Sequence, residues 1–313
     1  MDRVGASQVR AGNAPARRAN GATRSGFIAF AGRPNVGKST LANAIVGAKV
    51  AIVSDKPQTT RRAIRGIATG PGWQLVLVDL PGVQRPRDAL TERMQRRVER
   101  ELADADGCLF VVNAEEGIGP GDRFIAGLLK TSPVPVAIAV NKLDRVSRAG
   151  AAAVLQAAAD LDIADEVFPV TARDGTGIAP LTKHLASLLP EGPLYFEPHQ
   201  HSDQTEEVRL AELVREQVLR RTREEVPHAV EVQIETIDAR AELVRIEAIL
   251  LVETDSQKGI LIGAGGRMIK AIGTAARHAI ERELAARVHL ELTVRVRRHW
   301  RADERLLDRL GIE

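Results

Sequence analysis

The sequence GRPNVGKS at residues 32–39 decides the fold, because it matches the pattern G-x-x-x-x-G-K-[ST]. The apolar run FIAFA (27–31) precedes it, and the helix-forming run STLANAIV (39–46) overlaps its end. Glycines let the backbone curl so that successive N–H groups point at phosphate oxygens, and the following helix adds the positive end of its dipole. The sequence therefore predicts a nucleotide-binding P-loop with contacts from Gly32, Arg33, Pro34, Asn35, Val36, Gly37, Lys38, Ser39 and Thr40.

Two side chains of this loop have chemistry suited to a nucleoside triphosphate. We expect Lys38 to neutralise charge on the β- and γ-phosphates, and so to act in catalysis, and the Ser39 hydroxyl to ligate Mg²⁺. An empty glycine-rich turn is the alternative, and the position between a predicted strand and a predicted helix disfavours it.

Two further motifs follow predicted buried strands. In DLPG (79–82), we expect Asp79 to hold Mg²⁺ and the Gly82 backbone N–H to reach the γ-phosphate. NKLD (141–144) follows the apolar run PVAIAV, at the edge where open α/β sheets bind ligands. Asp144 can accept hydrogen bonds from the ring N–H and the exocyclic amine of guanine, a pair that adenine lacks. Asn141, Lys142 and Asp144 therefore predict GTP and GDP as ligands.

A switch segment is expected between the first helix and the next predicted strand. Gln58-Thr59-Thr60-Arg61 lies there, in a region flanked by glycine and proline. A segment that orders around the γ-phosphate supplies a further protein ligand to Mg²⁺. We favour Thr60 for this role, which would make it part of the catalytic set, and Thr59 is the rival.

The apolar pattern from Phe27 to Pro190 predicts the fold class. Strand-sized runs such as WQLVLVDL (73–80), GCLFVVNA (107–114) and EVFPVTA (166–172) alternate with helix-length segments. This alternation is typical of βαβ units. We therefore expect residues 26–190 to form an α/β P-loop domain with a doubly wound, mostly parallel sheet.

Composition places limits on the remaining possibilities. With 313 residues, 44% of them hydrophobic and 27% charged, the chain is typical of a soluble protein of two domains. No apolar run reaches the roughly 18 residues that span a bilayer. Cys108 is the only cysteine, which excludes an intramolecular disulfide. Residues 1–25 contain five arginines and one acidic residue, and we expect a disordered basic tail, with a transit peptide as the less favoured alternative.

A second, smaller domain is expected after a linker. Residues 191–204 are rich in proline and polar residues and have no periodicity, so we interpret them as the linker. Residues 205–313 then read as a helix (205–223), two strands (229–237 and 242–252), a glycine-rich turn, a helix to about residue 286 and a strand (288–297). This order predicts an α+β domain.

The turn IGAGGR (262–267) is the candidate RNA site of this domain. We expect it to join a strand end to a helix as the GxxG loop of a KH domain, which clamps single-stranded nucleotides, over an apolar floor of Ile260, Ile269 and Ile272. Residues 258–301 contain ten basic and three acidic residues, so the region is locally basic. The predicted RNA-binding residues are Lys258, Ile262, Gly263, Ala264, Gly265, Gly266, Arg267 and Lys270. Arg295, Arg297, Arg298 and Trp300 are interpreted as either an RNA contact or a solvated strand end.

The ordered motifs PNVGKS, TTR, DLPG and NKLD resemble those of the TrmE-Era branch of translation-factor-related small GTPases. The resemblance implies guanine contacts from Thr171, Ala172 and Arg173, chiefly through the Ala172 N–H. It also implies slow intrinsic hydrolysis, on the order of 10⁻⁴ s⁻¹, because Val83 stands where other GTPases have a water-orienting glutamine. It further implies a catalytic role for Asn35, holding K⁺ against the phosphates; the alternative is that Asn35 is simply a good turn residue.

From Phe27 to Glu313 the chain is similar to the Era-like members of that branch, which carry a C-terminal KH domain. The resemblance implies a cytoplasmic protein, expected to be monomeric, that binds small-subunit ribosomal RNA near its 3′ end and acts in assembly of the 30S ribosomal subunit. It also implies peripheral contact with the inner face of the cell membrane.

Two departures from the family pattern affect these expectations. Ala264-Gly265 replaces a more polar pair in the GxxG loop, so phosphate attraction would come from Lys258, Arg267 and Lys270. Leu80 replaces the usual threonine of the DxPG motif. A passive RNA-binding protein with a degenerate GTPase domain is the main alternative function. A metabolic P-loop kinase is disfavoured because NKLD selects guanine.

Overall fold

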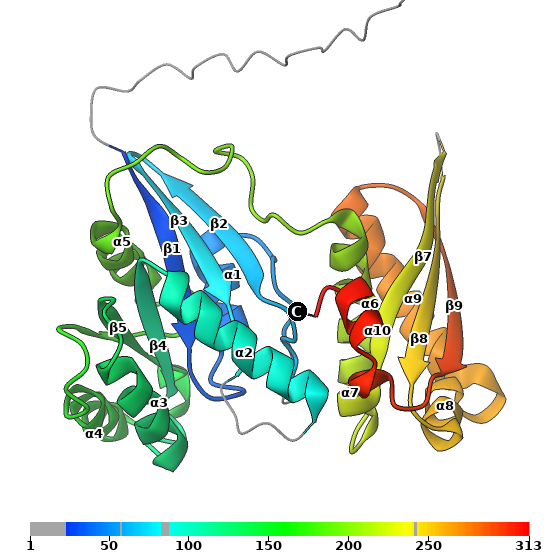
Figure 1. Cartoon of the computed structure of the whole chain (residues 1–313), viewed down its shortest axis with the longest axis horizontal. Helices are drawn as coiled ribbons and strands as arrows, with labels where there is room; N and C mark the ends of the chain where they lie inside the picture. The colour runs from blue at the N-terminus through cyan, green and yellow to red at the C-terminus, as the bar shows by residue number, and fades with distance from the viewer. Residues whose placement is uncertain (1–22, 57, 83–87, 241–242, 313) are drawn as a thin grey trace, which may run out of the picture.

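The computed structural model describes residues 23–56, 58–82, 88–240 and 243–312. They form two α/β units that lie side by side, with the C-terminal end of the chain between them (Figure 1). No helix in these ranges combines the length and the apolar character needed to cross a membrane.

The first unit is built on a six-stranded sheet in the order β2-β3-β1-β4-β5-β6. Its strands are β1 (Arg24–Ala31), β2 (Ile64–Gly70), β3 (Trp73–Asp79), β4 (Gly107–Asn113), β5 (Val136–Asn141) and β6 (Val167–Pro169). Neighbouring strands are parallel except for the pair β2 and β3. This is the mostly parallel sheet that the sequence predicts.

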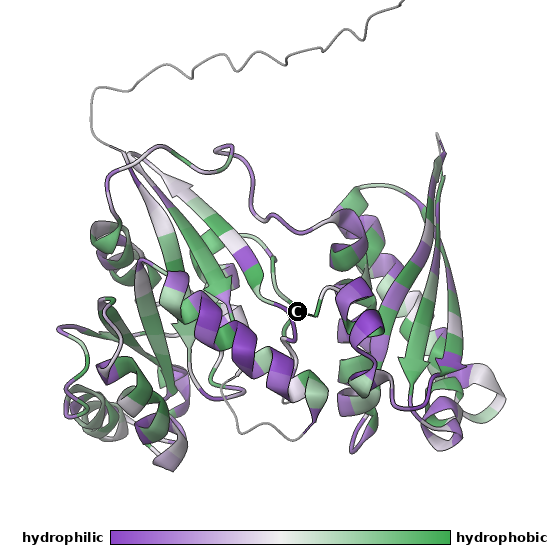
Figure 2. Cartoon of the chain, viewed as in Figure 1, coloured by the Kyte–Doolittle hydropathy of each residue, from purple (hydrophilic) through white to green (hydrophobic). Residues whose placement is uncertain are grey.

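Helices cover both faces of this sheet. Alternate residues of β1 point to opposite faces: Ile28 and Phe30 pack with α1 (Lys38–Val46) and α5 (Ile178–Leu188). Ala29 and Ala31 pack in the layer that contains α2 (Ala89–Asp104), α3 (Pro120–Lys130) and α4 (Arg148–Ala159). The strands of this sheet are mostly green in Figure 2, whereas the ribbon of α2 is largely purple, as expected for a helix with one face toward solvent.

The edge strand β2 was not predicted from the sequence. Its sequence, IRGIATG, contains two glycines and no long apolar run. A two-residue turn, Pro71-Gly72, pairs Gly70 with Trp73, and Gly72 has a φ of 78°. The Pro-Gly dipeptide is the sequence signal that could have revealed this hairpin.

The ends of this unit differ from the predicted boundaries. Arg24 and Ser25, which the sequence analysis assigned to the tail, belong to β1 and pair with Trp73 and Gln74. Residues 1–22 of the tail predicted at residues 1–25 lie outside the described residues. The interdomain linker follows the edge of the sheet, where the Ile67 N–H donates to the His201 carbonyl.

The second unit is built on a three-stranded sheet in the order β7-β8-β9. Its elements are α6 (Glu206–Arg221), α7 (Val226–Ala229), β7 (Glu231–Arg240), β8 (Leu243–Val252), α8 (Asp255–Ile262), α9 (Arg267–Leu284) and β9 (Val288–Val296). Strands β7 and β8 are antiparallel, and β8 and β9 are parallel. Helices α6 and α9 pack on one face through residues such as Val214 and Ile272. This is the predicted α+β unit with additional short helices.

Two predictions in this unit are wrong. The turn at residues 263–266 joins two helices, α8 and α9, and not a strand end to a helix. The apolar run GILI (259–262) ends α8, which starts at a capping box formed by Thr254 and Gln257. Ile272 is fully buried in the core, so it forms no part of a surface floor for RNA bases, whereas Ile260 is 49% exposed.

The C-terminal segment closes the contact between the two units. A turn of 3-10 helix, η3 (Trp300–Ala302), and helix α10 (Glu304–Arg309) lie between α2 and the second sheet (Figure 1). An apolar cluster there joins α2 and β8 to this segment through Leu90, Met94, Ile249, Leu251, Trp300, Leu306, Leu307, Leu310 and Ile312. The two units therefore share a small core of their own.

Candidate nucleotide and RNA sites

The P-loop curls around the side chain of Lys38. Gly32 and Gly37 have φ values of 148° and 101°, which L side chains rarely adopt. A Cβ on Gly32 would lie 2.6 Å from the Val111 carbonyl oxygen, so the backbone approaches β4 too closely for any side chain. The Lys38 ammonium donates to the carbonyl oxygens of Gly32 and Arg33 at 2.9 and 3.0 Å.

The protonation of Lys38 depends on its surroundings. Burial lowers the pKa of Lys38 to about 8, and the nearby Asp79 carboxylate opposes part of that effect. A buried ammonium group with carbonyl partners is poorly neutralised. The loop therefore presents a desolvated positive charge suited to a polyanion such as a phosphate chain.

The three predicted Mg²⁺ ligands lie together at the mouth of the P-loop. Ser39 Oγ donates to Asp79 Oδ2 at 2.6 Å, and Thr60 Oγ1 lies 3.1 Å from Ser39 Oγ and 3.3 Å from Asp79 Oδ2. Burial raises the pKa of Asp79, although the Ser39 hydrogen bond and the Lys38 charge oppose this. Asp79 Oδ1 is buried, and no described residue forms a hydrogen bond with it. Two hydroxyls and a carboxylate with a free oxygen fit the oxygen ligands that Mg²⁺ prefers.

The two candidate switch threonines point to different partners. Thr59 Oγ1 donates to the Lys56 carbonyl at 2.6 Å, inside the loop. Thr60 Oγ1 faces Ser39 and Asp79. Only Thr60 of the pair is thus next to the other two predicted metal ligands.

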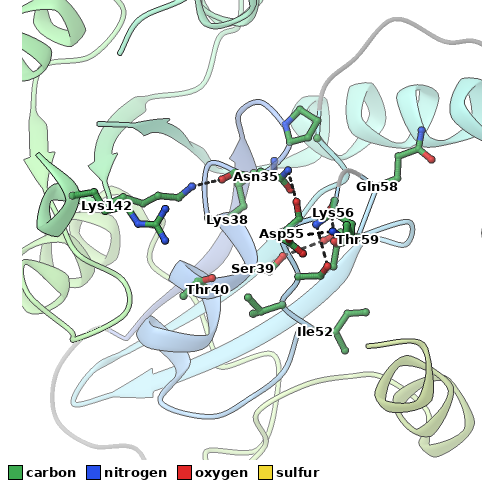
Figure 3. Close-up of a pocket in the computed structure, with 17 residues that line it drawn as sticks. Asn35, Lys38, Ser39, Thr40, Ile52, Asp55, Lys56, Gln58, Thr59 and Lys142 are labelled. Carbon is green, nitrogen blue, oxygen red and sulfur yellow. Dashed lines mark hydrogen bonds and ion pairs between the residues drawn. The ribbon is translucent and has the colours of Figure 1, made fainter. Parts of the chain in front are cut away.

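Asn141 connects the P-loop to the predicted guanine site. Its Nδ2 donates to the Val36 carbonyl at 3.0 Å, and its Oδ1 accepts from the N–H groups of Lys142 and Ala172 at 2.8 and 3.1 Å. Lys142 reaches back across the loop and donates to the Asn35 carbonyl at 2.7 Å (Figure 3). The NKLD motif is therefore fixed to the phosphate loop at two points.

The remaining guanine-site candidates lie at the ends of β5 and β6. Asp144 is exposed in a 3-10 turn, η1 (Leu143–Arg145), which follows Lys142 in the left-handed conformation at φ 66°. Thr171 and Ala172 are buried and Arg173 is exposed. The hydrogen bond from Ala172 N–H to Asn141 brings this segment to the NKLD motif.

A cavity of about 300 Å³ lies over the P-loop (Figure 3). The predicted residues Pro34, Asn35, Gly37, Lys38, Ser39, Thr40, Thr60, Gly82 and Lys142 line it. The structure thereby brings together one residue or more from each of the four motifs. The guanine-site candidates Asp144, Thr171, Ala172 and Arg173 are not among its lining residues, and Val83 lies outside the described residues.

Three P-loop side chains serve the surrounding structure. Arg33 turns toward α3 and forms ion pairs of 2.9 Å with both Glu116 and Asp122, so only its backbone faces Lys38. Val36 is fully buried in the core. The Asn35 amide donates to the Asp55 carbonyl at 2.9 Å, which links the P-loop to the switch segment.

The cavity also contains residues that sequence analysis missed. Ile52, Val53, Ser54, Asp55 and Lys56 form one wall, together with Gln58, Thr59 and Thr60 of the predicted switch. These residues directly precede the predicted switch threonine, and their position between the first helix and TTR is the signal that could have identified them. We call residues 53–60 the switch segment, of which residue 57 is not described.

The predicted RNA loop exposes its backbone. Gly263, Gly265 and Gly266 all have positive φ, between 60° and 75°. A Cβ on Gly263 would lie 2.7 Å from the Met268 Cβ, whereas Gly265 and Gly266 border open space. Ala264 and Gly265 are exposed at the tip, so a nucleic acid backbone has close access to this loop.

Basic residues surround this loop at the start of α9. Arg267 and Lys270 are exposed, and Lys258 and Ile262 on α8 are half-buried. A second cavity of about 300 Å³ runs beside them between α9 and β9, lined by Ile269, Lys270, Gly273, Thr274, Arg277, Leu290 and Leu292. An apolar floor with cationic edges suits stacked bases joined by phosphates.

The second candidate RNA contact, predicted at Arg295, Arg297, Arg298 and Trp300, includes both a buried and an exposed residue. Trp300 is fully buried and donates its indole N–H to the Ala229 carbonyl at 2.8 Å, so it belongs to the contact between the two units and not to an RNA surface. Arg295 is an exposed residue of β9 and pairs with Glu235 at 3.1 Å.

Comparison with known proteins places both units in established families. Residues 27–142 match the family described as 50S ribosome-binding GTPase, and residues 225–301 match the KH domain family. GTPase Era of Mycolicibacterium smegmatis is 44% identical over 294 residues, which cover 92% of this chain and 98% of that protein. GTPase Era of Mycobacterium tuberculosis is 45% identical with the same coverage.

Solved structures agree with this assignment. The crystal structure of Era in complex with MgGDPNP and nucleotides 1506–1542 of 16S ribosomal RNA superimposes with a TM-score of 0.89 at 32% identity, covering 93% of this chain and 99% of that one. The structure of Aquifex aeolicus Era Y63A bound to GDP·AlF₄⁻ gives the same values. Because the relatives align over both units and over nearly their whole lengths, the chain belongs to the GTPase Era family.

Proposed function

We propose that this protein is a GTP-hydrolysing switch that binds small-subunit ribosomal RNA through its KH domain and acts in assembly of the 30S subunit. The observation that carries the proposal is the cluster of Ser39, Thr60 and Asp79 beside the buried Lys38 ammonium. One member of this cluster comes from the switch segment. The cluster can therefore respond to the presence of a γ-phosphate.

The chain's own residues account for nucleotide binding and hydrolysis. The amide groups of the P-loop and the Lys38 ammonium bind the phosphates and stabilise charge that develops on them in the transition state. Ser39, Thr60 and Asp79 would hold Mg²⁺, which supplies positive charge to the β- and γ-phosphate oxygens when bound. The Gly82 N–H senses the γ-phosphate, and a Cβ on Gly82 would lie 2.7 Å from the Pro34 nitrogen.

Base selection and RNA binding use the remaining candidates. Asp144 accepts hydrogen bonds from guanine, and Asn141 holds this motif beside Ala172 by accepting the Ala172 N–H. The loop of Gly263, Ala264, Gly265 and Gly266 clamps single-stranded RNA, while Lys258, Arg267 and Lys270 attract its phosphates. The solved Era complex contains a segment of 16S ribosomal RNA, which supports this choice of partner.

A passive RNA-binding protein with a degenerate GTPase domain is the second candidate function, and no feature of the nucleotide site favours it. The intact cluster around Lys38 argues against a degenerate GTPase domain. We therefore place hydrolysis in the primary function.

The direct test measures GTP turnover by the full chain with and without a single-stranded fragment of the 16S ribosomal RNA 3′ end, in potassium and in sodium buffers. We expect slow turnover that the RNA fragment changes. Absence of guanine-nucleotide binding would overturn the proposal. Equal turnover in the two salts would remove the potassium role of Asn35, leaving its hydrogen bond to Asp55 as its function.

A cytoplasmic location follows from this function, because ribosomal subunits assemble in the cytoplasm. We also expect the protein to be monomeric. Contact with the inner face of the membrane stays a prediction. Sedimentation with anionic lipid vesicles tests it, with binding expected to fall as salt is raised if the contact is electrostatic.

A further inference from the structure

Residues 210–219 of helix α6 in the KH domain are all buried, although three of them are charged. Leu210, Leu213, Val214 and Val218 pack in the core of the second unit. On the remaining surface, Glu212, Arg215 and Glu216 are 3%, 0% and 0% exposed. Charged residues are almost never fully buried without ion-pair or hydrogen-bond partners. The partners of these three residues therefore show which segment the charged face of α6 binds.

The charged face of α6 contacts the switch segment at both of its ends. At the start, Glu216 Oε1 accepts from the Val53 N–H at 3.2 Å, and Glu216 Oε2 pairs with Lys49 at 2.5 Å. At the end, Arg215 Nη2 donates to the Thr59 carbonyl. The residues between these two points form one wall of the nucleotide cavity.

Arg215 is itself held in place. Its Nε and Nη2 donate to the two oxygens of Glu212 at 3.0 and 2.9 Å. Glu212 in turn accepts from Arg62, beyond the switch segment, at 2.7 Å. The guanidinium is therefore fixed on one side by a fork of two hydrogen bonds and reaches Thr59 with another N–H.

The two residues after Thr60 are also bound to the KH domain. Arg61 is buried and donates to Glu231 Oε2 at 2.8 Å and to the Val230 and His228 carbonyls at 2.6 and 2.8 Å. Arg62 donates to Glu231 Oε1 at 3.1 Å. Thr60 therefore lies between residues anchored on the KH domain, while its own hydroxyl faces Ser39 and Asp79.

We propose that Arg215 is a positioning residue for the GTP-bound state: through the Thr59 carbonyl it holds Thr60 beside Ser39 and Asp79, so that the KH domain completes the nucleotide site of the GTPase domain. Fixing the backbone of a residue costs conformational entropy. Anchors on both sides of Thr60 reduce that cost before the nucleotide binds. This inference rests on the proposed function, because it assigns Thr60 to the site that senses GTP.

The coupling works in both directions. If contact with α6 favours the arrangement that binds GTP, GTP must favour contact with α6 by the same free energy. GDP, which lacks the γ-phosphate, does not need Thr60. The anchors thus discriminate between the two nucleotides, and a residue of one domain contributes to ligand choice in the other.

The test compares affinities for a non-hydrolysable GTP analogue and for GDP, both with Mg²⁺, in the full-length chain. Arg215→Gln should lower the affinity for the GTP analogue by at least about fivefold, while the affinity for GDP stays within about twofold of the wild-type value. It should also raise the Mg²⁺ concentration for half-maximal analogue binding. Arg215→Lys, which keeps one charged donor, should recover part of the loss.

The matched control is Arg209→Gln on the same helix. Arg209 also crosses to the GTPase domain, but it donates to the carbonyls of Lys49 and Val50, before the switch segment. The ratio of analogue to GDP affinity should therefore stay at the wild-type value. Arg215→Met, an uncharged residue of similar length, serves as a second variant, and thermal unfolding without nucleotide verifies that each variant is folded.

The inference is overturned if Arg215→Gln and Arg215→Met lower the affinities for both nucleotides equally, or lower neither affinity. The proposed function would still stand in that case. Failure of the wild-type chain to bind the analogue would instead refute the proposed function. A selective loss in the Arg215 variants, absent in Arg209→Gln, supports the positioning role.

Discussion

At the residue scale, Gly37 has the most stringent requirement in the P-loop. Its φ of 101° suits only glycine, and an added Cβ would lie 2.3 Å from Asn141 Nδ2. Asn141 ties Val36 to Ala172, so its displacement disturbs the phosphate loop and the proposed guanine site together. The conformation of this one residue therefore supports two motifs that lie far apart in the sequence.

Gly37→Ala should lower GTP affinity by roughly tenfold to a hundredfold, because backbone strain of about 1–3 kcal/mol is introduced in the ligand-binding loop. Equilibrium titration with a fluorescent GTP analogue measures this. Gly47→Ala is the control, since Gly47 also has positive φ, at 74°, but borders open space. An affinity of Gly37→Ala equal to that of the control would contradict the geometry.

Glu231 gives a prediction about pH. Burial alone would raise the pKa of Glu231, but the charges of Arg62, Arg61 and Arg215 together lower it to about 2. Because the pKa is lower in the folded than in the unfolded chain, the stabilising contribution is complete above the unfolded value of 4.5. It is lost as the pH falls toward about 2.

Glu231→Gln should destabilise the chain by about 3–5 kcal/mol at neutral pH, since it leaves the buried Arg61 without a counter-charge. The difference in unfolding free energy between wild type and variant should stay constant from about pH 8 to about 5 and shrink by roughly 2 kcal/mol at about pH 3. Urea unfolding at several pH values measures it. A difference that does not change across this acid range would count against the charge network.

At the element scale, the proposed RNA contact of the loop between α8 and α9 depends on glycine, because Ala264 and Gly265 at its tip carry no charge. Gly265 is exposed with a φ of 60°, and a Cβ there would meet no atom within 4 Å. Side chains of aspartate and asparagine tolerate this conformation better than others. The position thus accepts a test of electrostatics with little change in shape.

Gly265→Asp should lower the affinity for a single-stranded 16S ribosomal RNA fragment by roughly tenfold, because a carboxylate then faces the phosphates. Gly265→Asn has nearly the same shape without the charge and should bind within about threefold of wild type. Titrations at two salt concentrations separate the effects, since repulsion weakens as salt is raised. If both variants bind equally well, the RNA backbone does not approach this loop.

The sequence predicted those helices, strands and loops whose residue pattern lies within one short stretch of the chain. The strand, loop and helix around GRPNVGKS carry a fixed spacing of glycines and apolar residues, and the strand before NKLD is a continuous apolar run. Helix α8 was missed because the apolar GILI run reads equally well as a strand, and only the capping box marks its start. Strand β2 lacks an apolar run altogether.

Whole-molecule contacts could not be predicted, because their signals are split between distant positions. Arg61 and Glu231 are 170 residues apart, and each alone reads as a solvated surface charge. The charged face of α6 has the same appearance, since hydrophobic periodicity marks only the side that packs on its own domain. The C-terminal segment around Trp300 joins the apolar cluster only through residues of α2 and β8.

At the scale of the whole molecule, the two domains are expected to act together. The switch segment lines the nucleotide cavity on one side and is anchored to α6 on the other. Two sites are coupled when a shared element has different free energies in the two ligand states, and typical couplings correspond to roughly 5- to 150-fold changes in affinity. RNA binding should therefore depend on which nucleotide is bound.

The most direct measurement is the affinity of the full-length chain for a 16S ribosomal RNA 3′-end fragment, titrated once with Mg²⁺ and a non-hydrolysable GTP analogue and once with Mg²⁺ and GDP. We predict that RNA binds at least about fivefold more tightly in the analogue state. Equal affinities in the two states would contradict this coupling, because the nucleotide site and the KH domain would then act independently.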